Sequence, residues 1–142
     1  MGLMGRQERI IAEFALVSDW EDRYKKIIDL GKALEALPEE KKTADFLVKG
    51  CQSQVWLHAE FINGRVVFFA DSDALLVRGL VHLLLQLYSD ATPEEILTTP
   101  PDFIKAIGLE QKLSPSRANG LLAMIKQMKF YALAFQAKAK GL

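Results

Sequence analysis

Two runs in which apolar and polar residues alternate flank the dipeptide Asn63-Gly64. Alternation with a period of two predicts β-strands, and Asn-Gly between two such runs predicts a type I′ turn, so residues 54–71 are expected to form a β-hairpin. Pairing outward from the turn sets Ile62 against Arg65 and Leu57 against Ala70. This register predicts one apolar face that covers the core: Val55, Leu57, Ala59, Phe61, Val66, Phe68 and Ala70.

The opposite face of the hairpin is mixed in character. It is therefore either exposed to solvent or covered by a partner or another segment. Its residues are Trp56, His58, Glu60, Arg65, Phe69 and Asp71.

Helical spacing of apolar residues dominates the rest of the chain. It predicts a helix at 6–17 and a second helix that begins after Ser18, which forms a capping-box pair with Glu21. Residues 73–89 are apolar almost all round, which predicts the central, most buried helix, with Ser72 as its N-cap. Gly79 inside it disfavours the helix on propensity grounds, so we expect another backbone to come close there.

Three further helix starts and one weak strand signal complete the pattern. Thr92 to Glu95 is a capping box with proline at the first helical position, residues 102–107 form a short helix ended by Gly108, and Ser114 opens the last helix. Residues 44–49 are a candidate edge strand. The predicted fold class is α+β, with a small antiparallel sheet, formed by the Asn63-Gly64 hairpin and this candidate edge strand, packed with several helices.

Composition favours one domain over residues 1–142, because 142 residues, half of them hydrophobic, are enough for a single core. Eighteen basic and eighteen acidic side chains cancel, which argues against nucleic acid and a membrane surface as partners. The N-terminus lacks the apolar segment of a signal peptide, and the apolar run Leu75–Tyr88 is shorter than a membrane span. We expect a cytoplasmic protein with a reduced thiol.

Cys51 is the only cysteine, so an internal disulfide and a multi-cysteine metal site are excluded. It is either a small buried apolar residue or a working thiol. Gly50 before it, with Gln52 and Ser53 after it, places it on a loop at the start of the first strand, where it can be presented to a partner. Thiol and hairpin together are the feature around which the chemistry of this chain is expected to be organised.

Neither histidine suits a role as the base of a Cys51 nucleophile. His58 is about 23 Å away at strand rise, and His82 is about 13 Å along the helix from its N-terminal end. This argues against a Cys-His hydrolase and against a metal site. The helix start after Ser72 favours an anion near the thiol, whereas the carboxylates of Asp71 and Asp73 oppose one. Such a thiol suits exchange with a sulfur presented by another protein.

Three blocks of the sequence resemble the SufE family of sulfur-acceptor proteins. They are GCQSQVW at 50–56, ADSDALLVRGL at 70–80 and LSPSRANGL at 113–121, in the family's order. The resemblance covers nearly the whole chain and implies a fold shared with the IscU-type scaffolds. The single cysteine, however, cannot hold a cluster as those scaffolds do.

The resemblance also implies a function. Members take sulfur from a pyridoxal-phosphate cysteine desulfurase of the SufS or CsdA type as a persulfide on the cysteine of GCQS, here Cys51, and pass it to an iron-sulfur scaffold. The chain would then be a carrier and activator with no cofactor of its own, since the pyridoxal phosphate belongs to the desulfurase. The implied support for Cys51 comes from Gly50, Gln52, Ser53, Asp71, Ser72, Asp73 and Arg117.

Two other classes of function remain open at this point. One is a scaffold or interaction module in which Cys51 is inert, and the other is a stand-alone thiol enzyme such as a peroxidase or peptidase. Helix capping by itself explains Ser72 and Ser114. The sequence leaves open the choice between the Suf and Csd systems, the final sulfur acceptor and the oligomeric state.

Overall fold

The two strands of the molecule, β1 (Val55–Ile62) and β2 (Arg65–Ser72), form the predicted hairpin. In the computed structural model, which describes residues 2–141, they pair antiparallel with Ile62 opposite Arg65 and Val55 opposite Ser72. Asn63 and Gly64 have φ values of 51° and 78°, as a type I′ turn requires. The predicted register is therefore confirmed along the whole hairpin.

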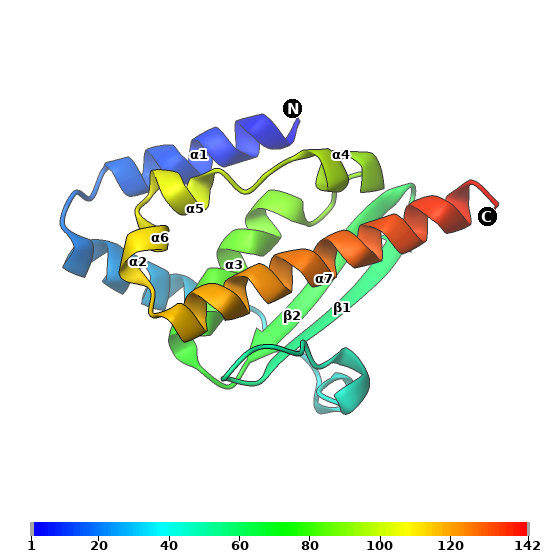
Figure 1. The fold of residues 1–142 in the computed structure, drawn as a ribbon, viewed down its shortest axis with the longest axis horizontal. Helices are drawn as coiled ribbons and strands as arrows, with labels where there is room; N and C mark the ends of the chain where they lie inside the picture. The colour runs from blue at the N-terminus through cyan, green and yellow to red at the C-terminus, as the bar shows by residue number, and fades with distance from the viewer. Residues whose placement is uncertain (1, 142) are drawn as a thin grey trace.

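The rest of the chain is mainly helical (Figure 1). The first two, α1 (Leu3–Ala15) and α2 (Trp20–Ala33), precede it, and α3 (Leu75–Tyr88) follows directly. Three short helices then lead to the long helix that ends the described chain. They are α4 (Pro93–Thr98), α5 (Phe103–Ala106) and α6 (Leu109–Lys112), and the long helix is α7 (Pro115–Ala139). The predicted α+β fold class is confirmed.

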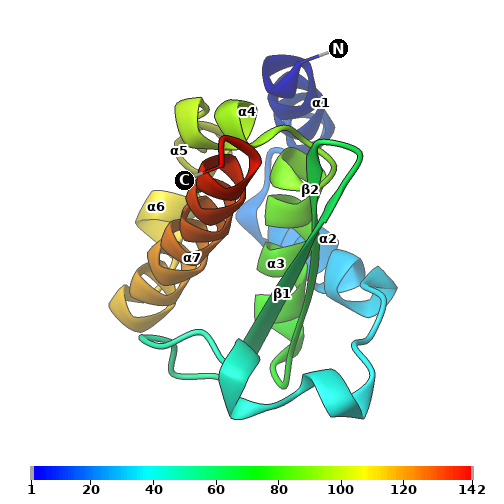
Figure 2. The same cartoon turned by 90° about the vertical axis from the view of Figure 1, so that its right-hand side faces the viewer.

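The core lies between the apolar face of the hairpin and two helices, α3 and α7. In Figure 2 the hairpin stands beside α3 with α7 crossing next to it, and α2 lies on the far side of α3. The predicted core face is buried except for Phe61, which is half-buried and stacks on Phe135 of α7 at 5.2 Å between ring centroids. Fully burying a large apolar side chain, as at Leu57 and Phe68, contributes about 1.5–3 kcal/mol. The packing of this face therefore holds α3 and α7 against the hairpin.

The mixed face of the hairpin is covered at one end by the connection between α2 and β1. That connection contains two single 3-10 turns, Glu39–Lys41 and Ala44–Phe46. Leu47 forms an isolated bridge with Trp56, and the amide of Val48 donates to the carbonyl of Val55 at 2.7 Å. Trp56 and Asp71 are consequently buried.

The edge strand predicted at 44–49 is therefore wrong, although Leu47 and Val48 of this segment do lie beside β1. A single bridge forms, since the chain turns away at Gly50, whose φ of 92° favours glycine. The first half of the segment, Ala44–Phe46, is a 3-10 turn instead.

Two glycines let α2 and α3 pack backbone to backbone. A Cβ at Gly79 would lie 2.0 Å from the carbonyl oxygen of Ile27, and one at Gly31 would lie 2.3 Å from that of Leu75. Both distances are too short for any side chain. The close approach predicted at Gly79 is confirmed, and its partner is α2.

Several helix boundaries differ from the predictions. The first helix begins at Leu3 and ends at Ala15, and α2 is capped by Asp19, whose carboxylate accepts from the amide of Glu21. In α3 the N-cap position is Ala74, so Ser72 is not its cap. The capping box predicted for α4 at Thr92 is confirmed, and so is the N-cap predicted for α7 at Ser114.

Candidate functional site

Residues 34–49, the part of the α2–β1 connection that covers the hairpin, are here called the covering segment. The loop Gly50–Ser53 follows this segment and carries Cys51 to the start of β1. Gly50 lies in the left-handed region, and a Cβ there would touch Cβ of Ala123 on α7 at 3.5 Å. The loop thus rests on the side of α7, a helix that begins more than sixty residues later in the chain. This contact places the first sequence block beside α7, the helix that carries most of the third block.

Cys51 is half-buried, and its Sγ lies 3.6 Å from the carbonyl oxygen of Gly120. Burial raises the pKa of the Cys51 thiol. Burial alone has this effect on the pKa, without a charged neighbour, because removing a thiolate from water disfavours the charged form. The resting group is accordingly a protonated thiol facing a backbone carbonyl.

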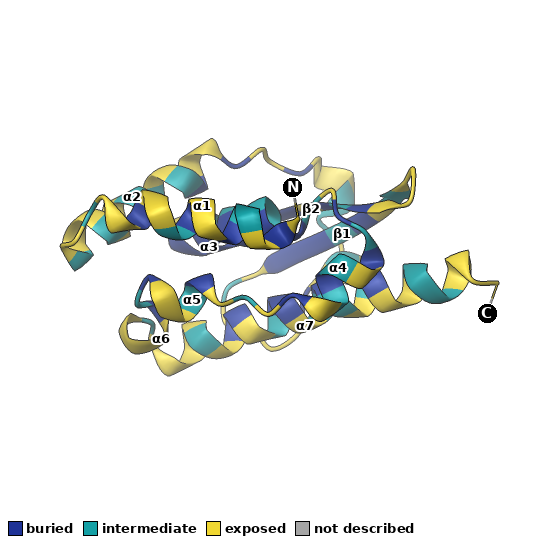
Figure 3. Cartoon of the chain, turned by 90° about the horizontal axis from the view of Figure 1, so that it is seen from above, coloured by how far each residue is buried: buried dark blue, intermediate teal, exposed yellow. Residues whose placement is uncertain are grey.

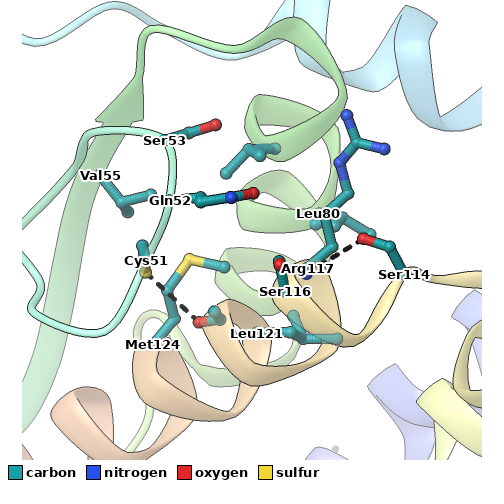
Figure 4. A pocket seen from close by; sticks show the side chains of 12 residues that line it. Cys51, Gln52, Ser53, Val55, Leu80, Ser114, Ser116, Arg117, Leu121 and Met124 are labelled. Atoms are coloured by element: carbon teal, nitrogen blue, oxygen red, sulfur yellow. Dashed lines mark hydrogen bonds between the residues drawn. The ribbon is translucent and has the colours of Figure 1, made fainter.

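The thiol opens into a cavity of about 260 Å³ between the loop, α3 and α7 (Figure 4). Gln52 and Ser53 supply polar groups from the loop, and Ser114, Ser116 and Arg117 supply them from the start of α7. The apolar walls are Val55, Val77, Leu80, Leu121 and Met124. A cavity with a thiol at one side, apolar walls and a polar mouth can enclose a sulfur species and limit its contact with water.

Gly120 is where α7 makes room for the thiol. A Cβ on Gly120 would stand 3.5 Å from the Sγ of Cys51, so the thiol occupies space that a larger residue would fill. The family resemblance includes Gly120 in the third block, whereas the apolar spacing of α7, which marks Leu121 and Ile125, assigns no role to the glycine before them. Sequence reasoning gave no role in the site to Ser116 or to the α3 residues Val77 and Leu80, because only the packing of α3 on α7 brings them to the loop.

Ser72 and Asp73 hold the far end of the loop and do not line the cavity. The carbonyl of Gln54 accepts from the Ser72 hydroxyl at 2.7 Å, and its amide donates to Oδ1 of Asp73 at 3.1 Å. The Ser72 oxygen also accepts from the amide of Ala74 at 3.2 Å. Ser72 and Asp73 therefore hold Gln54, at the end of the loop, close to the start of α3. These two residues are here called the clasp.

The predicted place of Asp73 in the first turn of the helix is wrong, because α3 begins at Leu75 and has no acidic residue in its first turn. The helix start that borders the cavity is that of α7 instead. Ser114 caps it by accepting from the amide of Arg117 at 3.3 Å, and Ser116 and Arg117 both line the cavity. The α3 helix contributes apolar side chains to the wall.

Asp71 lies apart from the cavity, fully buried under the covering segment. Its carboxylate accepts from Arg78 at 2.6 Å and from the amide of Leu37 at 3.0 Å, and Lys42 lies 3.4 Å away. Arg78 also donates to the carbonyl of Gly31 at 2.9 Å. This network joins β2, α3 and the end of α2, so Asp71 supports the fold beside the site.

The Arg117 side chain is exposed at the mouth of the cavity. The guanidinium makes no hydrogen bond or ion pair with any residue between 2 and 141. The histidines lie elsewhere, as expected. His58 packs between Phe46 and Phe69 on the outer face of the hairpin, and His82 pairs with Gln86 within α3.

Residues 2–141 contain no cluster of three or more His, Cys, Asp or Glu side chains that would hold a metal ion. Over the same residues, no helix combines the length and apolar character needed to cross a membrane. The polar groups at the mouth and the single thiol are therefore the chemistry that the described cavity offers.

A model of the SufE family, described as an Fe-S metabolism associated domain, matches residues 8–132 and so spans the loop, the clasp and the start of α7. This chain belongs to the SufE family. An uncharacterized SufE-like protein of Synechocystis sp. is 45% identical over 128 residues, covering 90% of this chain and 80% of its own length. Another from Rhizobium etli is 43% identical over 131 residues, covering 89% and 88%.

The fold also matches a solution structure of a hypothetical protein from Thermus thermophilus, with a TM-score of 0.75. That structure covers 91% of this chain and 94% of its own, at 22% sequence identity. The likeness supports the fold of this SufE-family chain. Membership of the family links the chain to Fe-S metabolism.

Proposed function

We propose that this SufE-family protein accepts sulfur from a pyridoxal-phosphate cysteine desulfurase of the SufS or CsdA type as a persulfide on Cys51, and that it activates that enzyme. It passes the sulfur on to iron-sulfur cluster assembly in the cytoplasm. The observation that carries the proposal is the seating of the only cysteine in a cavity of its own, in a chain whose family is associated with Fe-S metabolism.

The transfer is a thiol–persulfide exchange. Cys51 loses its proton to solvent, and its thiolate attacks the outer sulfur of the donor's cysteine persulfide. The new bond joins Sγ of Cys51 to that sulfur, the S–S bond of the donor breaks, and the donor cysteine leaves as a thiolate that takes up a proton. No oxidant or reductant is consumed. The pyridoxal phosphate that mobilises the sulfur belongs to the desulfurase.

The cavity suits a carrier better than an enzyme that works alone. Hydrolysis or peroxide reduction needs a thiolate at rest, which an adjacent base or positive field usually provides. Here the pKa of Cys51 is raised by burial, and neither histidine lines the cavity. A thiol kept protonated until a partner engages the loop is protected against reaction with other small molecules in the meantime.

Intact-mass spectrometry tests the proposal. The protein is incubated with the cysteine desulfurase of the same genome and with cysteine, and it should gain the mass of one sulfur atom and increase desulfurase turnover. Cys51→Ser, which keeps nearly the same size, should lose both effects. A parent protein that gains no sulfur would favour the scaffold with an inert cysteine, and Cys51→Ser that stimulates fully would reduce the role to activation alone.

A further inference from the structure

Helix α7 carries large apolar side chains on the side that faces away from the core. Leu122, Phe130 and Leu133 are 62%, 64% and 52% exposed, and Lys126 lies between them. The spacing of four, four and three residues puts all four on one stripe, opposite the buried stripe of Leu121, Ile125 and Met128. A helix that is apolar on both sides but covered on one has a face that a partner can bury.

This outer stripe borders a groove next to the Cys51 loop. The groove has a volume of about 570 Å³ and lies between α7 and the covering segment, with Leu47, Lys49, Lys126 and Phe130 among its lining residues. Ala123, which also lines it, is the residue that Gly50 of the loop approaches. Figure 3 shows exposed residues along the outer edge of α7, away from α1 and α2.

The charge that α7 brings to this side is positive, and Asp45 is the one carboxylate among the residues that line the groove. From Gln111 to the end of the chain there is no Asp or Glu, whereas the chain as a whole is neutral. The cations of this segment are Lys112, Arg117, Lys126, Lys129, Lys138 and Lys140. Lys49 and Lys126 stand beside the exposed apolar residues, so a complementary surface has an apolar centre and acidic groups at its rim.

We infer that Leu47, Lys49, Leu122, Lys126, Phe130 and Leu133 form a docking surface for the sulfur donor, here called the α7 surface. This inference rests on the proposed function, since the donor is taken to be the desulfurase. Its contact face is an apolar patch rimmed by Asp and Glu. A protein seated there touches the α7 side on which the loop rests, which puts its own persulfide within reach of Cys51 once the loop moves.

A second copy of this chain fits the surface less well. In a two-fold contact the same patch faces itself, so Lys126 and Lys49 would oppose their own counterparts, with Asp45 as the one carboxylate among the groove's lining residues to offset them. Like charges brought together oppose association. A partner of opposite charge gains from the same lysines.

Binding of the desulfurase, measured by calorimetry with the Cys51→Ser protein so that no sulfur moves, tests the inference. Phe130→Ala should weaken the affinity by about tenfold or more, since large aromatic side chains are frequent anchors of interfaces. Leu16→Ala, which removes another highly exposed apolar side chain after α1, is its control and should change the affinity less than about twofold. Circular dichroism checks that each variant keeps its helices.

Charge reversal supplies the second arm. Lys126→Glu should weaken binding by about tenfold at low salt, and the loss should shrink as salt rises, whereas Lys32→Glu on α2 makes the same change of net charge and should leave affinity unchanged. If Phe130→Ala and Lys126→Glu both bind the desulfurase as tightly as the parent protein does, the docking surface is refuted and the carrier role is not. A dimer of this chain that Phe130→Ala dissociates would likewise refute the docking surface alone.

The two proposals fail in different ways. Binding that depends on the α7 surface without any sulfur on Cys51 of the wild-type protein would refute the carrier role and leave the docking surface standing. Sulfur transfer to Cys51 of the wild-type protein, with unchanged affinity in the α7-surface variants, would support the carrier role and refute the docking surface. A parent protein that does not bind the desulfurase at all would refute both.

Discussion

The thiol of Cys51 and the carbonyl of Gly120 face each other at 3.6 Å across the loop and α7. The contact joins two sequence blocks that are 69 residues apart. It depends on the absence of a side chain at Gly120, and it fixes where the thiol rests in the folded protein. The depth of this seat can be changed by substitution at one position.

Gly120→Leu should expel Cys51 from its seat, because a branched side chain would fill the space now taken by Sγ. We expect faster alkylation of Cys51 by iodoacetamide at pH 7, followed by mass spectrometry, and a loss of about 1–3 kcal/mol in the free energy of unfolding from overpacking. Gly120→Ala is the control, since its Cβ would stand at an ordinary contact distance of 3.5 Å. Equal alkylation rates in all three proteins would show that Gly120 does not seat the thiol.

The raised pKa of Cys51 makes a prediction about pH. Alkylation of the folded protein should rise with pH and reach its midpoint above that of the same protein in denaturant, because burial holds the proton on sulfur. The folded state keeps a proton that the unfolded chain has released in this range. Stability should therefore fall as pH rises past the pKa of the unfolded thiol.

Cys51→Ser isolates this effect, since the hydroxyl does not titrate in the same range. Its free energy of unfolding should lack the part of the alkaline decline that the thiol causes. A midpoint of alkylation in the folded protein at or below that in denaturant would contradict the burial of the thiol.

The clasp at Asp73 should control how readily the loop leaves its seat. Asp73→Ala removes the acceptor for the Gln54 amide, and because that amide is exposed the stability cost should be only about 0.5–1 kcal/mol. The loop should nevertheless become more mobile, seen as faster alkylation of Cys51 and faster hydrogen exchange at Gln54. Asp73→Asn retains an oxygen acceptor, so its alkylation and exchange rates should lie between those of the wild type and of Asp73→Ala. Identical hydrogen exchange at Gln54 in all three proteins would show that Asp73 does not hold the loop.

Asp71 should matter for stability far more than for chemistry. Asp71→Ala leaves Arg78 without its carboxylate partner, and we expect a loss of about 3 kcal/mol, the low end for a buried pair because Arg78 and Lys42 remain partly exposed. Urea denaturation measures it. Asp29→Ala on the exposed side of α2 is the control, with an expected change within about 0.5 kcal/mol. A similar small change in both would mean that the network adds nothing to the fold.

The sequence by itself determined the local structure around the site. Asn63-Gly64 fixed the turn, and a two-residue turn leaves the strands one register, so the faces of the hairpin followed from alternation alone. The caps at Thr92 and Ser114 were readable because a capping side chain and the amide it accepts from lie within three residues. The position of the single cysteine on a loop before the first strand was also readable from its neighbours in the sequence.

Only the tertiary structure decided what meets Cys51. Gly120, Val77 and Leu80 reach the thiol through the packing of α3 on α7, and contacts between residues so far apart leave no period in the sequence. The burial of Trp56 and Asp71 likewise depends on a connection that makes one bridge and no strand. Ser72 and Asp73 read as part of a helix start, yet they hold Gln54, because a polar side chain near a helix end bonds to whichever backbone group the fold brings within reach.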